Sequence, residues 1–475
     1  MSESEAAAAP SLDTGTAEAI DEAIMDREDR LRPEFVERVL DAVEAGDGAT
    51  ARALVEPLHP ADVADLIELA RADEREGLVA ALAGIVDADV IAEMNEHVRD
   101  RLLDEMGPQQ LADLAGQLDT DDAVAILEDL EDDERRAVLR AMEPDDRAAM
   151  EQALGYPEES AGRLMQRDLI AVPDHWSVGQ VIDYLRSGEQ LADDFWEVFV
   201  VSPTHHPVGT CRLSAILRQP RKTRVLDIMV EDQTLIPVGK DQEEVALRFQ
   251  KYALISAAVV DTGGRLVGMI TVDDIVHIIQ EEAGEDALLL SGAGDGDINE
   301  PIGLTVRTRL TWLVINLGTA IVAASVVGLF QGEISRFALL AVLMPIVSGM
   351  GGNAGTQTLA VVVRALATNQ LASSNTVRMI AREFKIALAN GLALGLLIGG
   401  GTWLLFHNPR LGLVIGAAMI INNLVAGLAG ILVPVGLDRA RVDPAVSSAV
   451  FVTMATDVMG FFSFLGLAAV AGLGG

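Results

Sequence analysis

Five long apolar segments in the C-terminal part of the chain restrict its fold more than any other feature. They cover residues 310–330, 337–365, 386–406, 411–437 and 445–473. Each segment is long enough to cross the hydrocarbon core of a bilayer as a helix, which takes about 20 residues. A backbone surrounded by lipid must satisfy its own hydrogen bonds, so helices are the expected structure. Residues 306–475 are therefore predicted to form a transmembrane domain with five spans.

Basic residues at the ends of these segments predict how they cross the membrane. The loops on one side carry most of them: Arg307, Arg309, Arg364, Arg378, Arg382, Lys385, Arg439 and Arg441. The loops on the other side carry Arg336 and Arg410. Because basic loops stay in the cytoplasm, the N-terminal part is expected to be cytoplasmic and the C-terminus outside. The expected location is the cell (inner or plasma) membrane, with several spans.

One acid, Asp457, lies in the middle of the fifth apolar segment. An ionisable side chain at bilayer depth costs about 2.5–3.5 kcal/mol, and such residues commonly face a cavity, a partner or an ion path. A structural ion pair across helices is the alternative interpretation. No Lys or Arg lies deep in any of the segments, so the pattern favours a functional acid.

Amides and glycines in the other segments add further polar groups. The second segment carries Pro345, Gly351-Gly352-Asn353 and Gln357, and the fourth carries Asn422-Asn423. Proline and glycine are expected to loosen the second helix and free carbonyls that face protein or water. Close packing through small residues is the alternative, and it accounts for the glycines but not for the amides.

The combination of one carboxylate with amides and carbonyls suits a hard cation such as Mg²⁺ or Ca²⁺ rather than copper or zinc. Asp457, Asn353, Gly351 and Gly352 are the candidate residues of an ion path. Such a path can lie on a two-fold axis between subunits or within the helices of one subunit, and residue spacing leaves both possibilities open.

The N-terminal part carries the negative charge of the chain. The net charge is −37, yet residues 301–475 contain only five Asp or Glu. This balance disfavours nucleic acid as a partner and suits cations; plain solubility is the alternative. The single cysteine, Cys211, excludes a disulfide framework. Residues 1–17 lack the apolar core of a signal peptide and are expected to form a disordered tail.

Residues 18–160 show the apolar spacing of three to four that is typical of amphipathic helices. Short strings such as Leu58-His59-Pro60 and Asp119-Thr120-Asp121 precede several of these runs. Pro, Asp and Thr in such places are typical of helix N-termini, so most of these Asp residues are interpreted as caps. The repetition predicts an all-α helical-repeat domain, called the helical domain below.

Residues 161–226 and 227–282 each predict strands and helices in the order β-α-β-β-α. Two such units in tandem resemble a pair of CBS modules, called module 1 and module 2 below. Thr271 and Asp274 match a pair that contacts ribose in nucleotide-binding members, which makes ATP a candidate cofactor there. Module 1 has Arg212 and Ala215 at the equivalent places and lacks the pair.

These features together resemble the MgtE family of magnesium channels and transporters. The resemblance runs from about residue 50 to the end and rests on five strings: Tyr156–Met165, Thr271–Asp274, Gly351–Asn353, Val442–Ala445 and Thr456–Val458. It implies a homodimer with a cytoplasmic all-α helical-repeat domain, tandem α/β CBS modules, a connecting plug helix over 283–305 and a five-helix transmembrane domain. The predicted fold class is therefore a multi-domain membrane protein.

The resemblance also implies roles for individual acids. Asp457 would hold hydrated Mg²⁺ in the pore, and cytosolic Mg²⁺ would close the channel by bridging acidic surfaces. The positions that match the family's regulatory acids are Asp121, Asp241, Glu243, Asp274, Glu285, Asp286 and Asp443. At Ala125, Ala253 and His277 the chain departs from the family, which often has acids there.

The expected function is a Mg²⁺-selective channel or transporter that cytosolic Mg²⁺ gates shut. The sequence shows no nucleophile–base constellation and no phosphate-binding loop of a pump, so enzyme activity is not expected. One alternative is a CBS-regulated transporter of Co²⁺ or Mn²⁺. The other is a membrane-anchored sensor of Mg²⁺ or nucleotide that moves no ions.

Overall fold

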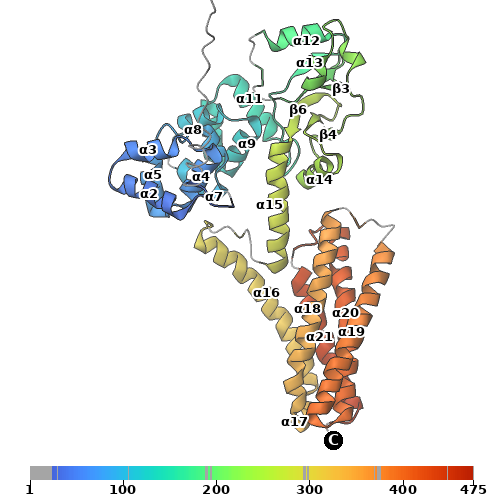
Figure 1. Ribbon diagram of the computed structural model, residues 1–475. Helices are drawn as coiled ribbons and strands as arrows, with labels where there is room; N and C mark the ends of the chain where they lie inside the picture. Colours follow the sequence, from blue (N-terminus) through green and yellow to red (C-terminus); the bar gives the residue numbers. More distant parts are fainter. Residues whose placement is uncertain are drawn as a thin grey trace, which may run out of the picture. The chain divides into compact units, whose positions relative to one another are not determined.

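The computed structural model describes residues 24–473 except 29, 105, 188–190, 193–194, 293–295, 297–298, 369, 372–375 and 447. The tail expected at 1–17 lies outside the described residues, as do the side chains of Asp286 and Ser291. The chain divides into two compact units, Met1–Val276 and His277–Gly475 (Figure 1). The expected combination of a helical domain, α/β modules and long apolar helices is confirmed.

The helical domain consists of short helices joined by tight turns. They are α2 (Pro33–Glu44), α3 (Gly48–Val55), α4 (Pro60–Leu69), α5 (Ala72–Ala81), α6 (Ala88–Ala92), α7 (Glu96–Leu103), α8 (Pro108–Ala115), α9 (Thr120–Asp129), α10 (Asp132–Ala141) and α11 (Pro144–Ala153). Proline occupies the first position of several of these helices, where its missing N–H group costs nothing.

The pair α4–α5 is repeated as α9–α10. The same positions of the first helix are buried in both copies: Val63, Ala64, Leu66 and Ile67 in α4, and Ala123, Val124, Ile126 and Leu127 in α9. An arginine caps the end of each of these helices. Arg75 Nη2 donates to the carbonyl of Glu68 at 2.8 Å, and Arg135 Nη1 donates to that of Glu128 at 3.4 Å. The repeat predicted from the short strings with Pro, Asp and Thr is thus a helix pair.

Modules 1 and 2 have the same topology. Module 1 contains β1 (Ala171–Pro173), α12 (Val178–Leu185), β2 (Glu197–Val201), β3 (Pro207–Arg212), α13 (Leu213–Arg218) and the 3₁₀ turn η1 (Val225–Asp227). Module 2 contains β4 (Leu235–Pro237), α14 (Gln242–Tyr252), β5 (Ser256–Val260), β6 (Leu266–Thr271) and the start of α15 (Val272–Ser291). Each sheet has its middle strand parallel to the first strand and antiparallel to the third.

The register of the two sheets is also the same. Glu197 pairs with Arg212 in module 1, and Ser256 pairs with Thr271 in module 2. Arg212 therefore occupies the place of Thr271, as the sequence predicted. The modules pack through apolar side chains of their sheets, including Phe199 of β2 and Met269 of β6, which are buried in one cluster.

The string Tyr156–Met165, called the linker string below, ties the helical domain to module 2. Sequence boundaries placed its last residues in module 1. Instead, the N–H groups of Ala161 and Gly162 donate to the carbonyls of Lys240 and Val238 at 2.7 and 2.8 Å. Arg163 forms an ion pair with Glu128 at the end of α9. The linker string therefore holds α9 next to the second module.

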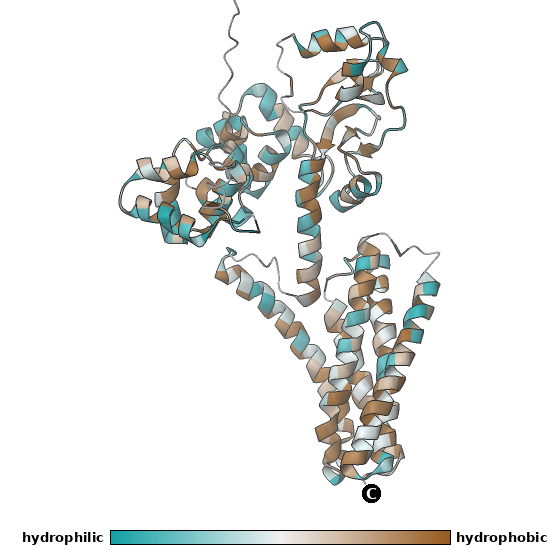
Figure 2. Ribbon diagram, viewed as in Figure 1, coloured by the Kyte–Doolittle hydropathy of each residue, from teal (hydrophilic) through white to brown (hydrophobic). Residues whose placement is uncertain are grey.

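The C-terminal unit contains α16 (Ile302–Leu329), α17 (Gln331–Arg336), α18 (Leu339–Ala367), α19 (Thr376–Phe406), α20 (Pro409–Arg439) and α21 (Ser448–Val470). Five of these helices are long and apolar enough to cross a membrane, which confirms the five predicted spans. Figure 2 shows hydrophobic residues concentrated along them. Of the connecting helix expected over 283–305, the structure describes the end of α15, which runs to Ser291, and the start of α16 at Ile302.

The second span, α18, differs from the expectation of a loosened helix. It is continuous through Pro345 and through all of its glycines. A proline removes a single backbone hydrogen-bond donor. Packing by the surrounding helices allows the other backbone hydrogen bonds of α18 to persist. Gly355 instead brings helices close together, because a Cβ atom on it would lie 2.6 Å from Val452 Cγ1, whereas one on Gly349 or Gly352 would meet no atom within 4 Å. The packing alternative is therefore supported for Gly355, and the role of Gly352 in the ion path stays a prediction.

Glycines also set the contact between α19 and α20. A Cβ atom on Gly399 would lie 2.7 Å from the carbonyl oxygen of Gly412, and one on Gly395 would lie 2.7 Å from that of Gly416. Backbones that approach this closely gain dispersion contacts, which drive helix association in lipid. α20 also packs against α18 and α21, so it is the centre of the bundle.

We expect Gly399→Ala to lower the midpoint of thermal unfolding of the detergent-solubilised protein by about 3–6 °C, because overpacking costs about 1–3 kcal/mol. Gly400→Ala is the matched control, since a Cβ atom on Gly400 meets no atom within 4 Å. Equal midpoints for the two variants would contradict this account of the α19–α20 contact.

Candidate metal sites

Asp457 lies near the middle of α21 and is half-buried. Its carboxylate accepts a hydrogen bond from the hydroxyl of Ser348, which lies on α18. The acid thus meets a neutral donor at the contact between two membrane helices. Sequence analysis missed Ser348, although a hydroxyl one turn before the Gly351-Gly352-Asn353 string was visible in the sequence.

Asn422 of α20 fills the space between α18 and α21. Its amide Nδ2 donates to the carbonyl of Val347 at 2.8 Å. A Cβ atom on Gly351 would overlap this amide, and one on Gly460 would lie 2.8 Å from it. Gly351, which the sequence offered as part of the ion path, therefore makes room for Asn422.

The side-chain oxygens of Asn422 and Asn423 are buried and have no hydrogen-bond partner among the described residues. Both amides are at most 1 % exposed. A buried acceptor without a donor costs about 1–3 kcal/mol, so such groups commonly meet water or an ion. Asn422 therefore brings one such acceptor to the contact of α18 with α21, whereas Asn423 lies against Gly391 of α19.

The middle of the exposed face of α18 is polar. Gly349, Asn353, Thr356 and Gln357 are exposed, and their spacing places them on one side of the helix. The hydroxyl of Thr356 donates to the carbonyls of Gly352 and Asn353, both at 3.1 Å. Amide side chains on the outside of a membrane helix would lose hydrogen bonds in lipid. This face is therefore suited to water or to a second protein surface.

In the N-terminal unit, Asp121 and Asp122 of α9 lie close to Asp274 of α15 and form an acidic cluster. Burial, followed by the nearby Asp274 carboxylate, raises the pKa of Asp121 well above its ordinary value. The same two causes raise the pKa of Asp122 to about 6. Asp121 Oδ1 is buried and has no hydrogen-bond partner among the described residues. A bound cation would offset the mutual repulsion and the burial cost of carboxylates that are held together in this way.

Asp274 is also the partner of Thr271. Thr271 Oγ1 donates to Asp274 Oδ2 at 2.6 Å, and Gln166 of the linker string's C-terminal flank lies 3.4 Å from the same oxygen. Burial raises the pKa of Asp274 to about 6, although the Thr271 hydroxyl opposes the shift. The candidate nucleotide pair and the acidic cluster therefore share one carboxylate.

Other predicted acids have structural contacts. Asp241 caps α14 and accepts the N–H group of Glu243 at 3.0 Å, while Asp443 accepts that of Ala445 at 2.7 Å before α21. Both are exposed, and each keeps one oxygen for a further ligand. Glu243 is half-buried and Glu285 is exposed. The side chain of Asp286 lies outside the described residues.

A group of possible ligands that the sequence analysis missed lies on α7. Single atoms of Glu96, His97 and Asp100 come within 4.8 Å of one another. Burial, followed by the charge of Asp129, raises the pKa values of Glu96 and Asp100. In the sequence, this group could have been recognised as two acids at positions i and i+4 of a helix with a histidine between them.

Comparison with known families supports the interpretation of both units. Residues 344–467 match the model of the MgtE family, described as a divalent cation transporter. Residues 58–159 match the MgtE intracellular N domain, and residues 225–281 match the CBS domain. The intracellular match agrees with the orientation predicted from the basic loops, so the protein is a multi-pass membrane protein with a cytoplasmic N-terminal domain.

Whole proteins are similar over most of their length. Magnesium transporter MgtE of Enterococcus faecalis is 35% identical over 384 residues, which cover 80% of this chain and 84% of that protein. Magnesium transporter MgtE of Bacillus subtilis is 28% identical and covers 92% of this chain and 97% of the relative. A crystal structure of the cytosolic domain of the Mg²⁺ channel MgtE in complex with ATP is 27% identical, covers 51% of this chain and 99% of its own, and has a TM-score of 0.47. The chain belongs to the MgtE family of divalent cation transporters.

Proposed function

We propose that this protein conducts Mg²⁺ across the cell membrane and that Asp457 attracts the ion. The observation that carries the proposal is a half-buried carboxylate in the middle of a membrane helix whose hydrogen-bond partner is the hydroxyl of Ser348. No Lys or Arg lies in the segment 445–473. A cation in the membrane path supplies the charge that the protein does not, and the relatives named magnesium transporters support Mg²⁺ as that cation.

The ion path is proposed to lie between two copies of the chain. Asn353 and Gln357 are exposed on α18, where lipid would leave their amides without partners. A second copy across a two-fold axis would cover this face and place two Asp457 side chains on the path. Mg²⁺ releases water reluctantly, so a hydrated ion held through its waters by few carboxylates suits such a site.

Cytosolic Mg²⁺ is proposed to regulate the path by binding at the acidic cluster. Asp121 and Asp122 belong to the helical domain, whereas Asp274 belongs to module 2. An ion between them would favour the packing of these two parts, and a change in that packing would reach the membrane through α15. Further regulatory ligands are proposed at Asp241, Glu243, Glu285, Asp286 and Asp443.

ATP at Thr271 and Asp274 is proposed as a second ligand of module 2. Both residues lie at the point where β6 ends and α15 begins, and their side chains are already hydrogen-bonded to one another. Because Asp274 also belongs to the acidic cluster, nucleotide and Mg²⁺ would affect the same carboxylate. Binding of either ligand is then expected to change the affinity for the other.

We expect Asp457→Asn to lower Mg²⁺ influx at least about tenfold, because it removes the charge and preserves the shape of the side chain. Uptake into proteoliposomes and growth of a Mg²⁺-dependent bacterial strain at low Mg²⁺ measure the effect. Glu333→Gln on α17 is the matched control, since it removes an acid of the same domain outside the apolar segments.

The outcomes of this experiment separate the alternatives. Equal influx through wild type and Asp457→Asn would exclude Asp457 from the path. A preference for Co²⁺ or Mn²⁺ over Mg²⁺ would favour a transporter of those ions. A wild-type protein that moves no ion and rescues no growth would favour a sensor.

The acidic cluster predicts a specific pH dependence. Asp122 and Asp274 have pKa values that are raised from the ordinary 3.8 to about 6. Between these two pH values, the folded state therefore binds more protons than the unfolded state. The free energy of unfolding contributed by these groups therefore falls as pH rises through this window. Mg²⁺ is expected to restore this free energy of unfolding above pH 7. It should have little effect at pH 5, where the cluster is protonated.

Hydrogen exchange of α9 in the full-length protein measures this effect. We expect Mg²⁺ to slow exchange about tenfold at pH 7.5, which corresponds to about 1.4 kcal/mol. Asp121→Asn should lose this protection, whereas Asp145→Asn, an exposed acid of α11, should keep it. Full Mg²⁺ protection in Asp121→Asn would refute the proposed regulatory site.

A further inference from the structure

The amide side chain of Asn422 lies where three membrane helices meet. Asn422 belongs to α20, and its Nδ2 donates to the carbonyl of Val347 on α18 at 2.8 Å. A Cβ atom on Gly351 of α18 would overlap this Nδ2, and one on Gly460 of α21 would lie 2.8 Å from it. Both glycines are buried. The amide therefore occupies a tight space that α18 and α21 both border.

This space adjoins the hydrogen bond between Ser348 and Asp457. Gly351 follows Ser348 by three residues on α18. Gly460 follows Asp457 by three residues on α21. Residues that are three apart are neighbours on the surface of a helix. Asn422 therefore touches each helix about one turn from the residue through which the two helices are hydrogen-bonded.

The hydrogen bond from Asn422 acts on the backbone of Ser348. The carbonyl of Val347 belongs to the peptide group that joins Val347 to Ser348, and a peptide group is planar and rigid. A donor from α20 thus fixes the point on α18 from which the Ser348 side chain extends. Because Ser348 donates to Asp457 in turn, a series of contacts runs from α20 through α18 to the acid of α21.

Packing alone does not explain a polar side chain at position 422. Asn422 is 0% exposed, and its Oδ1 has no hydrogen-bond partner within the ranges that the structure describes. A buried acceptor without a donor is unfavourable, and an apolar side chain would avoid it. The donor of the amide, which reaches Val347, is the part of the side chain that an apolar residue could not supply.

The next residue, Asn423, contacts a different helix. Its Nδ2 donates to the carbonyl of Met419 in its own helix at 2.9 Å. A Cβ atom on Gly391 of α19 would lie 3.2 Å from the Cβ atom of Asn423. Asn423 is also buried, and its Oδ1 likewise lacks a partner among the described residues. Of these two amides, Asn422 is the one that donates across to α18.

We propose that Asn422 is a positioning residue of the ion path. Through its hydrogen bond to Val347, it holds Ser348 where the serine hydroxyl orients the Asp457 carboxylate for the ion. A carboxylate that is oriented in advance loses less side-chain freedom when an ion binds. The inference rests on the proposed role of Asp457 in conduction, and it assigns a specific task to the fourth span.

The test measures Mg²⁺ influx into proteoliposomes over a range of Mg²⁺ concentrations, per folded protein. We expect Asn422→Ala to raise the concentration for half-maximal influx about three- to tenfold, which is the effect of one hydrogen bond. The maximal influx should change less, because Asp457 keeps its charge. A purely structural role would instead lower the amount of folded protein and leave the half-maximal concentration unchanged.

Asn423→Ala is the matched control, because it removes the same buried amide from the same helix. Both variants leave a cavity, so both should lower the midpoint of thermal unfolding of the detergent-solubilised protein. Asn423→Ala should nevertheless keep the wild-type concentration for half-maximal influx, since its side chain does not reach α18.

A double variant separates the hydrogen bond from the filling of space. In Gly351→Ala/Asn422→Ala, the methyl group added on α18 occupies part of the space that the amide leaves. The midpoint of thermal unfolding should therefore return toward the wild-type value. The half-maximal concentration should stay raised, because no donor reaches Val347. This variant also decides the matter if Asn422→Ala does not fold.

Asp457→Asn in the same assay separates failure of this inference from failure of the proposed function. If Asp457→Asn lowers influx while Asn422→Ala matches wild type, Asp457 acts in the path and Asn422 does not position it. An equal rise of the half-maximal concentration in Asn423→Ala, or its return to the wild-type value in the double variant, would also overturn the inference. If Asp457→Asn leaves influx unchanged, the proposed function fails and the role of Asn422 fails with it.

Discussion

Carboxylates that the protein itself leaves without a positive partner are the constraint on which this molecule depends. Asp457 meets a serine hydroxyl at bilayer depth, and Asp121 meets the carboxylate of Asp274 in the cytoplasmic unit. On the proposed function, a cation at either place would supply the positive charge that the protein does not. Conduction and regulation would then use one physical principle: the ion completes a structure that the sequence leaves electrostatically incomplete.

Much of the architecture could be predicted from the sequence, because it depends on local pattern. The five spans follow from the lengths of the apolar segments. The helix repeat follows from the strings with Pro, Asp and Thr that precede α4 and α9. The register of β2–β3 and β5–β6 repeats closely enough for the alignment of Arg212 with Thr271 to be read from the sequence. The identity of the polar residues, Asp457 above all, indicated the class of ion.

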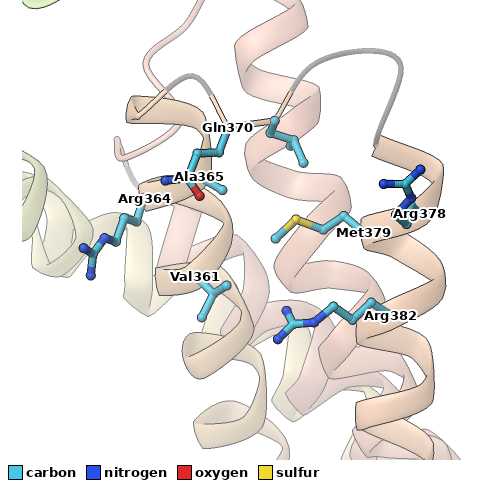
Figure 3. A pocket seen from close by; sticks show the side chains of 8 residues that line it. Val361, Arg364, Ala365, Gln370, Arg378, Met379 and Arg382 are labelled. Carbon is cyan, nitrogen blue, oxygen red and sulfur yellow. The ribbon is translucent and has the colours of Figure 1, made fainter. Parts of the chain in front are cut away.

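Contacts between distant segments could not be predicted in the same way. Ser348 is separated from Asp457 by two spans, and only their packing makes the hydroxyl a donor. Gly351 was attributed to the ion path because a glycine in a membrane helix suits an exposed carbonyl as well as it suits a neighbour's side chain. Arg364, Arg378 and Arg382 were used only as markers of orientation, and only the folded chain shows that they line one pocket, of about 450 Å³, at the ends of α18 and α19 (Figure 3).

The linker string determines where this protein can be divided. Gln166 exchanges two backbone hydrogen bonds with Met269, and Ala161 and Gly162 extend the same attachment. A truncated chain that begins at Ala171, the first residue of β1, would strip an edge from module 2. An isolated pair of modules would keep its natural edge only if it began upstream of Ser160. In this protein, the boundary of an independently folding piece is set by strand pairing and not by sequence order.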